Sequence, residues 1–128
     1  MENQNAALTK QDRQGIISKQ ITDTLREEYR LKEKIASLIL KYNEQWEQTD
    51  KSVIADNVEE YICRKYPSCV DMFDYRWKKL VEISGAKEQT VYAWLNRSRK
   101  DVKIPFLKLC QIAVALDSDI AELLKAHE

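Results

Sequence analysis

The chain has very few of the residues that make turns: two glycines, Gly15 and Gly85, and two prolines, Pro67 and Pro105, among 128 residues. Sheets need frequent tight turns, and those turns depend heavily on glycine and proline. The scarcity of both, in a chain rich in Leu, Glu, Lys, Ala and Gln, predicts an all-α fold. Each glycine or proline is then expected to mark a joint between helices.

Cysteine and histidine are also scarce. The three cysteines, Cys63, Cys69 and Cys110, are an odd number at no regular spacing, and the single histidine is His127. Without a CxxC pair no zinc site is expected, and we expect three reduced thiols in a cytoplasmic protein. With no glycine-rich phosphate loop and no carboxylate pair beside a partner base, we expect no metal, no cofactor and no enzymatic activity.

Long apolar runs and net charge are missing as well. No run approaches the ~20 apolar residues that span a membrane, so no membrane segment is expected. The polar start, MENQNAALTKQ, has no apolar core of a signal peptide. Because 21 Lys and Arg balance 21 Asp and Glu, only the distribution of charge can argue for a nucleic-acid partner.

After a polar tail at residues 1–8, the segment up to residue 48 is typical of one long amphipathic helix, and 1–48 is expected to form a first domain. Positions recur at spacings of mostly four and three in a heptad-like stripe: Ile17, Ile21, Leu25, Glu28, Leu31, Ile35, Leu38, Tyr42 and Gln45/Trp46. Such a stripe is expected to be buried, either in a homodimer through this N-terminal helix or by folding back on the chain. The sequence leaves both open. The apolar run Leu38-Ile39-Leu40 indicates that the last turns also contact the following domain.

Residues 49–128 are expected to form the second domain. Asp50 or Ser52 can cap a helix over residues 53–65, and Tyr66-Pro67 ends it because the residue before proline avoids the α region. The run from Ser68 to Asp71 resembles a capping box, which predicts a following helix through Met72 and Trp77 up to Gly85.

The segment WKKLVEISGAKEQTVYAWLN, from Trp77 to Asn96, has the pattern of a helix-turn-helix. Gly85 supplies a residue that tolerates positive φ at the turn. Val91 and Trp94, three residues apart, are expected to face the first helix. Polar side chains at the start of the second helix are then expected to face the bases in the major groove of DNA: Lys87, Glu88, Gln89, Thr90, Tyr92 and Ala93.

Positive charge is concentrated around this motif. Between Arg76 and Lys103 there are eight basic residues and three acidic ones, a net charge of +5 in a neutral protein. A local basic patch is the electrostatic footprint expected for phosphate contacts. Lys78 and Lys79 are therefore expected phosphate contacts.

The longer segment ISGAKEQTVYAWLNRSRKDVKIPFLKLCQIAVALDSDIAELL resembles the lambda-repressor-like family, the Cro and XRE type of helix-turn-helix. The resemblance implies a five-helix DNA-binding bundle, with Pro105 in the first turn of the fourth helix and a cap at Asp117-Ser118 for the fifth. It places Glu88, Gln89, Thr90 and Ala93 at base-facing positions. It also implies backbone contacts from Asn96, Arg97, Arg99, Lys100 and Lys103.

The sequence departs from the family pattern at several positions. Lys87 stands where a capping Ser or Thr is usual, and Glu88 brings a negative charge to the reading face. The first expectation is a sequence-specific double-stranded DNA-binding protein, a transcriptional regulator of bacterial, phage or mobile-element type. The alternative is a protein-interaction module, such as an antirepressor, adaptor or inhibitor, that keeps the fold without reading DNA.

Overall fold

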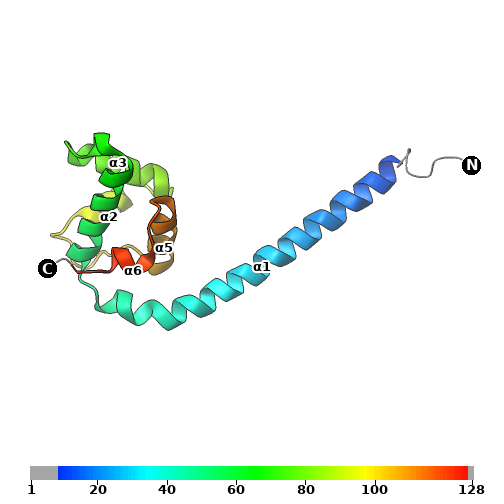
Figure 1. Ribbon diagram of the computed structural model, residues 1–128, viewed down its shortest axis with the longest axis horizontal. Helices are drawn as coiled ribbons and strands as arrows, with labels where there is room; N and C mark the ends of the chain where they lie inside the picture. The colour runs from blue at the N-terminus through cyan, green and yellow to red at the C-terminus, as the bar shows by residue number, and fades with distance from the viewer. Residues whose placement is uncertain (1–8, 127–128) are drawn as a thin grey trace, which may run out of the picture. The chain divides into compact units, whose positions relative to one another are not determined.

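The structure is a computed structural model that describes residues 9–126. Within this range the chain forms six α-helices and one short 3-10 turn and contains no strand, which confirms the all-α prediction. In chain order they are α1 (Lys10–Gln48), α2 (Lys51–Lys65), η1 (Pro67–Cys69), α3 (Phe73–Ser84), α4 (Glu88–Leu95), α5 (Phe106–Ala115) and α6 (Ile120–Leu123) (Figure 1). The expected polar tail at residues 1–8 and His127 lie outside the described residues.

The chain divides into two compact units, residues 1–40 and 41–128. This division lies within α1, whereas the sequence placed a domain boundary after residue 48. The reason is aromatic packing inside the second unit, because the rings of Tyr42 and Trp46 lie 6.1 and 6.3 Å from the ring of Phe106. Trp46 Nε1 also donates to the Ile104 carbonyl at 2.9 Å. The last turns of α1, from Tyr42 on, therefore pack within the second unit, whereas Leu38 and Leu40, on which the prediction of this contact rested, are 52% and 80% exposed.

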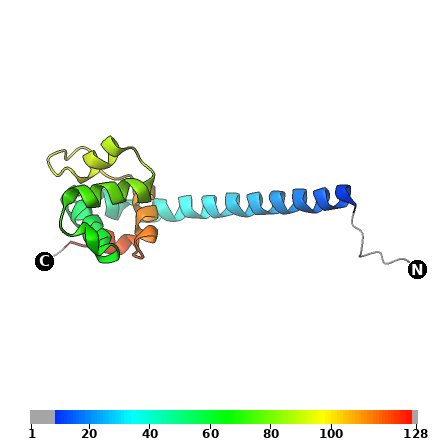
Figure 2. The same ribbon diagram turned by 90° about the horizontal axis from the view of Figure 1, so that it is seen from above.

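The helices of the second unit lie together in one bundle (Figure 2). Five of them, α2 to α6, contribute to one hydrophobic core. The contacting pairs include α2 with α3 and α6, α3 with α4 and α5, and α5 with α6. Every one of these helices supplies at least one side chain that is almost completely buried: Ile54, Val58, Ile62, Leu80, Val91, Leu95, Leu109, Ile112 and Leu123. A contiguous set of this kind holds a small helical domain together.

α2 ends where the sequence indicates and begins at Lys51, two residues earlier than expected, with Asp50 as its cap. The side chain of Asp50 accepts a hydrogen bond from the Ser52 amide at 2.7 Å, and Tyr66 ends the helix directly before Pro67. The predicted capping box at residues 68–71 is wrong. α3 begins after Met72 without a side-chain cap. The preceding segment is instead tied inward, because Cys69 is buried and its carbonyl accepts a hydrogen bond from Arg76.

The C-terminal end is closed by polar contacts. Asp119 caps α6 by accepting from the Glu122 amide at 3.0 Å. Asn57, fully buried on α2, donates to the carbonyls of Leu123 and Lys125 at 2.9 Å each. Asp117 does not cap α6, contrary to the sequence reading. It has a positive φ of 56° just beyond α5 and forms an ion pair with Lys65.

Candidate nucleic-acid interface

The turn between α3 and α4 is built around Gly85. Its φ is +69°, in the left-handed region, and its amide donates to the Val81 carbonyl at 2.9 Å, which ends α3. The glycine that the sequence placed at the turn is therefore confirmed there. Lys108 on α5 donates to the Ser84 carbonyl at 3.1 Å and so ties the turn to a third helix.

Helix α4 is held from two sides. Val91 and Trp94 are buried in the core, as predicted for the inward face, and Leu95 is buried with them. Ala93 is also buried, at 7% exposure, so its predicted place on the base-facing surface is wrong. Lys51 of α2 also reaches this part of α4, where its ammonium lies 2.6 Å from the Ala93 carbonyl.

Lys51 is the anchor that sequence reasoning missed. It is 6% exposed, and its Nζ donates to the carbonyls of Ala93 and Arg99 at 2.6 Å each. Burial lowers the pKa of this amine, but the two carbonyls satisfy the charge. Lys51 thus joins α2 to the end of α4 and to the loop that follows. A lysine directly after a helix cap carries no sequence signal of such burial.

The other expected base-facing residues are exposed together on the first two turns of α4: Lys87, Glu88, Gln89, Thr90 and Tyr92. Lys87 has an extended backbone and makes no side-chain cap, as its identity predicted. Lys87 therefore offers no side-chain acceptor to the backbone amides in the first turn of α4. Free amides at a helix N-terminus favour an anionic partner.

Tyr92 is half exposed, and its ring is fixed by two other rings. It meets Phe73 and Trp77 edge to face, at centroid distances of 6.0 and 5.7 Å. Trp77 in turn donates from Nε1 to the Glu88 carbonyl at 2.9 Å. These contacts hold the N-terminal half of α4 against α3, so the exposed polar side chains project from a rigid element.

Several basic residues of the +5 stretch form ion pairs and hydrogen bonds within the fold. Arg97 bonds to Asp56 at 2.6 Å, to Glu59 and to the Leu95 carbonyl at 2.8 Å. Burial acts to lower the pKa of Arg97, but the hydrogen bonds to Asp56 and Glu59 outweigh it and raise that pKa. Arg76 also pairs with Glu59, at 2.7 Å. Arg97 is therefore a structural side chain, and the expectation of a free phosphate contact there is corrected.

Lys103 and Lys79 are engaged as well. Lys103 donates to the Trp46 carbonyl and lies 4.4 Å from the centroid of the Trp46 ring, where burial lowers its pKa. It ties the end of α1 to the loop before α5, so its predicted role at phosphates is also corrected. Lys79 pairs with Glu82 at 2.9 Å on the same helix.

The remaining basic side chains of the stretch are exposed: Lys78, Lys87, Arg99 and Lys100. None of them forms an ion pair within residues 9–126. Asn96 is half buried, and its Oδ1 accepts from the Ser98 amide at 3.0 Å, which shapes the loop that displays Arg99 and Lys100. The structure thus narrows the basic patch to four side chains from α3, the start of α4 and this loop.

Other chemistry is limited in the described part of the chain. No group of three His, Cys, Asp or Glu side chains within residues 9–126 is placed to hold a metal ion. Cys63, Cys69 and Cys110 are free thiols, and burial raises the pKa of Cys63 and Cys110, which lowers their reactivity. None of the described helices combines the length and apolar character needed to cross a membrane.

Comparison with known proteins finds no family model, no curated protein and no solved structure that matches this chain.

Proposed function

We propose that residues 41–128 bind double-stranded DNA through α4, as a lambda-repressor-like bundle of the Cro and XRE type formed by α2 to α6. On this proposal the protein is a transcriptional regulator of bacterial, phage or mobile-element type. The observation that carries the proposal is the pair α3 and α4 joined at Gly85, with polar side chains exposed on a rigidly held α4.

The exposed side chains of α4 have the chemistry that reads base edges. Gln89 can pair with adenine through two hydrogen bonds, and Thr90 offers a hydroxyl and a methyl group. Lys87 can reach guanine or a phosphate, and Glu88 can accept from the amino group of cytosine. If Gln89 makes its bidentate contact, Gln89→Ala should cost about 1–3 kcal/mol at one base position and relax the preference there.

The phosphate contacts are assigned to Lys78, Lys87, Arg99 and Lys100, the exposed part of the basic stretch. Arg97 supports this set indirectly. By bonding to α2 and to the Leu95 carbonyl, it fixes the start of the loop that carries Arg99 and Lys100. Affinity is then expected to fall as salt rises, with a slope set by the number of phosphates neutralised.

A second candidate is a protein-interaction module that uses the same exposed face. It is favoured by the occupied charges of Arg76, Arg97 and Lys103, and by Glu88 on the face itself. A module of this kind would bind another protein and would show no salt-dependent affinity for duplex DNA.

A gel-shift titration with random-sequence duplexes at low salt separates the two candidates. The DNA-binding proposal predicts a retarded species whose salt slope falls by about one when Arg99 is changed to Ala. Arg26→Ala is the matched control, because Arg26 is an exposed arginine on α1, in the other unit, and should leave the slope unchanged. The absence of any retarded species at low salt rejects the DNA-binding proposal.

A further inference from the structure

Helix α1 carries an apolar stripe that nothing in its own unit covers. Its apolar members in the first unit are each between 46% and 57% exposed: Ile17, Ile21, Leu25, Leu31, Ile35 and Leu38. No residue of α1 is buried. Six large aliphatic side chains aligned along one helix are far more than the scattered apolar residues of an ordinary surface, and such patches mark interaction sites.

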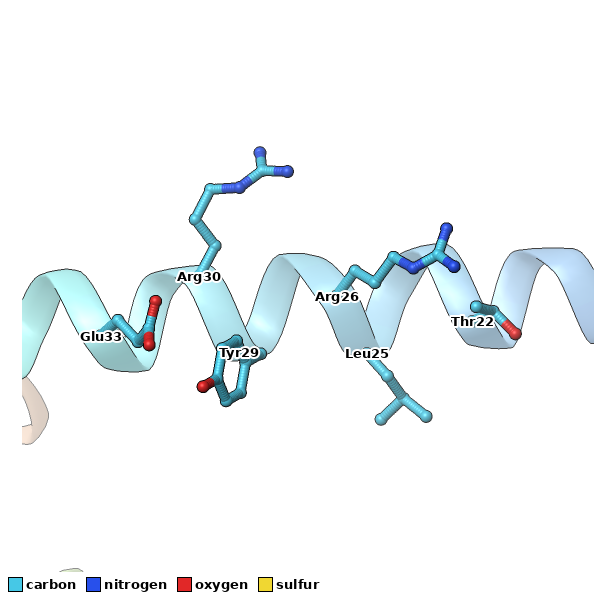
Figure 3. A pocket seen from close by; sticks show the side chains of 6 residues that line it. All are labelled: Thr22, Leu25, Arg26, Tyr29, Arg30 and Glu33. Atoms are coloured by element: carbon cyan, nitrogen blue, oxygen red, sulfur yellow. The ribbon is translucent and has the colours of Figure 1, made fainter.

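Charged residues flank this stripe and cover the opposite face. Figure 3 shows Leu25 and Tyr29 pointing to one side of α1 while Arg26 and Arg30 extend to the other. Arg30 pairs with Glu27 at 3.0 Å within the same helix. Several charges of the polar face are thus paired within the helix, and the apolar stripe is the part of α1 that lacks a partner in its own unit.

We propose that this stripe pairs with the same stripe of a second copy of the chain, as a parallel, in-register, two-stranded coiled coil. Residues 17–38 span three heptads, or about 33 Å of helix. The central positions fall into two rows. The a row is Ile21, Glu28 and Ile35, and the d row is Ile17, Thr24, Leu31 and Leu38.

Charge pairs at the positions that flank the central rows favour the parallel direction. In a parallel pair, the residue just before an a position (heptad position g) lies beside position e of the second copy, which is five residues later in the sequence. Glu27 then lies opposite Lys32 of the second copy, and this attractive pair occurs twice. In the antiparallel register that pairs Ile21 with Leu31, Glu27 meets Glu27 of the second copy instead. Like charges in that position are destabilising.

Glu28 is the charged layer of this register. It is the one charged residue in the central rows, and Lys32 lies 2.9 Å from it on the same helix as a counter-ion. In register, Glu28 lies opposite Glu28 of the second copy, a like-charge contact that Lys32 of each helix offsets. Thr24 lies opposite Thr24, and every other central layer is aliphatic. A shift by one heptad would set Glu28 against Ile21 or Ile35 of the second copy. A single polar residue in the a row is a known way to specify register.

This dimer does not rest on the proposed DNA binding, since it uses residues 17–38 and no residue of the second unit. If both hold, a parallel coil sends two copies of residues 41–128 from the same end. Two helices equivalent to α4 could then address two half-sites on one duplex.

Light scattering on the full chain measures the pairing. The wild-type protein should have twice the chain mass of 15.1 kDa. The double variant Leu31→Lys, Ile35→Lys should be monomeric, with the thermal midpoint of its tryptophan fluorescence unchanged, because all three tryptophans lie in residues 41–128. Leu40→Lys is the matched control. Leu40 is 80% exposed and lies off the stripe, so this variant should remain a dimer. A monomeric wild type, a larger assembly, or a dimer that survives the double variant overturns the proposal.

Oxidative cross-linking of Ile17→Cys in the full chain tests the direction. A parallel, in-register coil places the two new thiols side by side, so a covalent dimer should form rapidly. In the antiparallel alternative Ile17 faces Ile35 of the second copy, and the two thiols are about 27 Å apart. The wild-type chain under the same oxidant reports any contribution from Cys63, Cys69 and Cys110. A dimeric Ile17→Cys variant that gains no cross-link over wild type contradicts the parallel arrangement.

Discussion

Replacing Arg97 with Ala separates a structural arginine from a DNA-contacting one. Arg97 bonds to Asp56, to Glu59 and to the Leu95 carbonyl. Arg99 stands two residues later, is exposed and forms no ion pair within residues 9–126. Arg97→Ala should therefore destabilise the second unit, whereas Arg99→Ala should leave its stability within about 0.5 kcal/mol of wild type.

The magnitude follows from the exposure of the partners. The side chain of Asp56 is 59% exposed, so its pair with Arg97 contributes at most about 1 kcal/mol. Glu59 is only 11% exposed, but it keeps Arg76 at 2.7 Å when Arg97 is lost. The loss at Glu59 is then that of one charged hydrogen bond, about 1–1.5 kcal/mol after discounting for the 35% exposure of Arg97. The sum is about 2 kcal/mol.

For a unit of this size, about 2 kcal/mol corresponds to a fall of roughly 8–16 °C in the thermal midpoint. Tryptophan fluorescence is the suitable signal, because Trp46, Trp77 and Trp94 all lie in the second unit. A midpoint for Arg97→Ala within 2–3 °C of wild type would refute the reasoning. So would an equal fall for Arg99→Ala.

Three further changes test the joints of the bundle. Lys51→Met should lower the free energy of unfolding, measured in urea, by about 3 kcal/mol, because the carbonyls of Ala93 and Arg99 lose a buried charged donor. A decrease below ~1 kcal/mol would contradict that role. Gly85→Ala should cost about 1–2 kcal/mol from its φ of +69° alone, since nothing lies within 4 Å of an added Cβ, and Gly85→Asn should cost less. The hydrogen bond from the Ser52 amide lowers the pKa of Asp50 below its ordinary value of 3.8. The charged cap therefore contributes its full stability above about pH 4, and this contribution is lost as the pH falls through the lowered pKa of the folded state. Asp50→Asn should flatten that part of the pH dependence of the midpoint, and an unchanged profile would contradict it.

Much of the fold could be predicted because its signals are local. A helix depends mainly on residues close together in the sequence. The scarcity of glycine and proline and the stripe at helical spacing therefore predicted the helices, and Asp50 and Pro67 mark the two ends of α2. The capping box at residues 68–71 failed because a tertiary contact overrides it: Cys69 is buried and Arg76 binds its carbonyl. Pro105 directly precedes α5, one position before the predicted first turn.

The candidate site was less predictable, because a side chain's availability depends on distant partners. Arg97 is as basic as Arg99 in the sequence, yet Asp56 and Glu59, some forty residues away in the chain, occupy only Arg97. Likewise, Ala93 is buried, and its carbonyl accepts from Lys51, which lies 42 residues earlier in the chain. Patterns within one helix cannot show such contacts, so the exposed polar set was predicted better than the basic one.

Selection from a pool of random duplex DNA, at low salt and with the full chain, tests the central claim most directly. The account predicts that wild-type protein enriches a defined sequence. It also predicts that the double change Gln89→Ala, Thr90→Ala abolishes or alters that enrichment while leaving the thermal midpoint within about 3 °C, since both side chains are exposed on α4. A wild-type protein that retains no duplex above background would contradict the claim, as would an enriched sequence that is identical for the double variant.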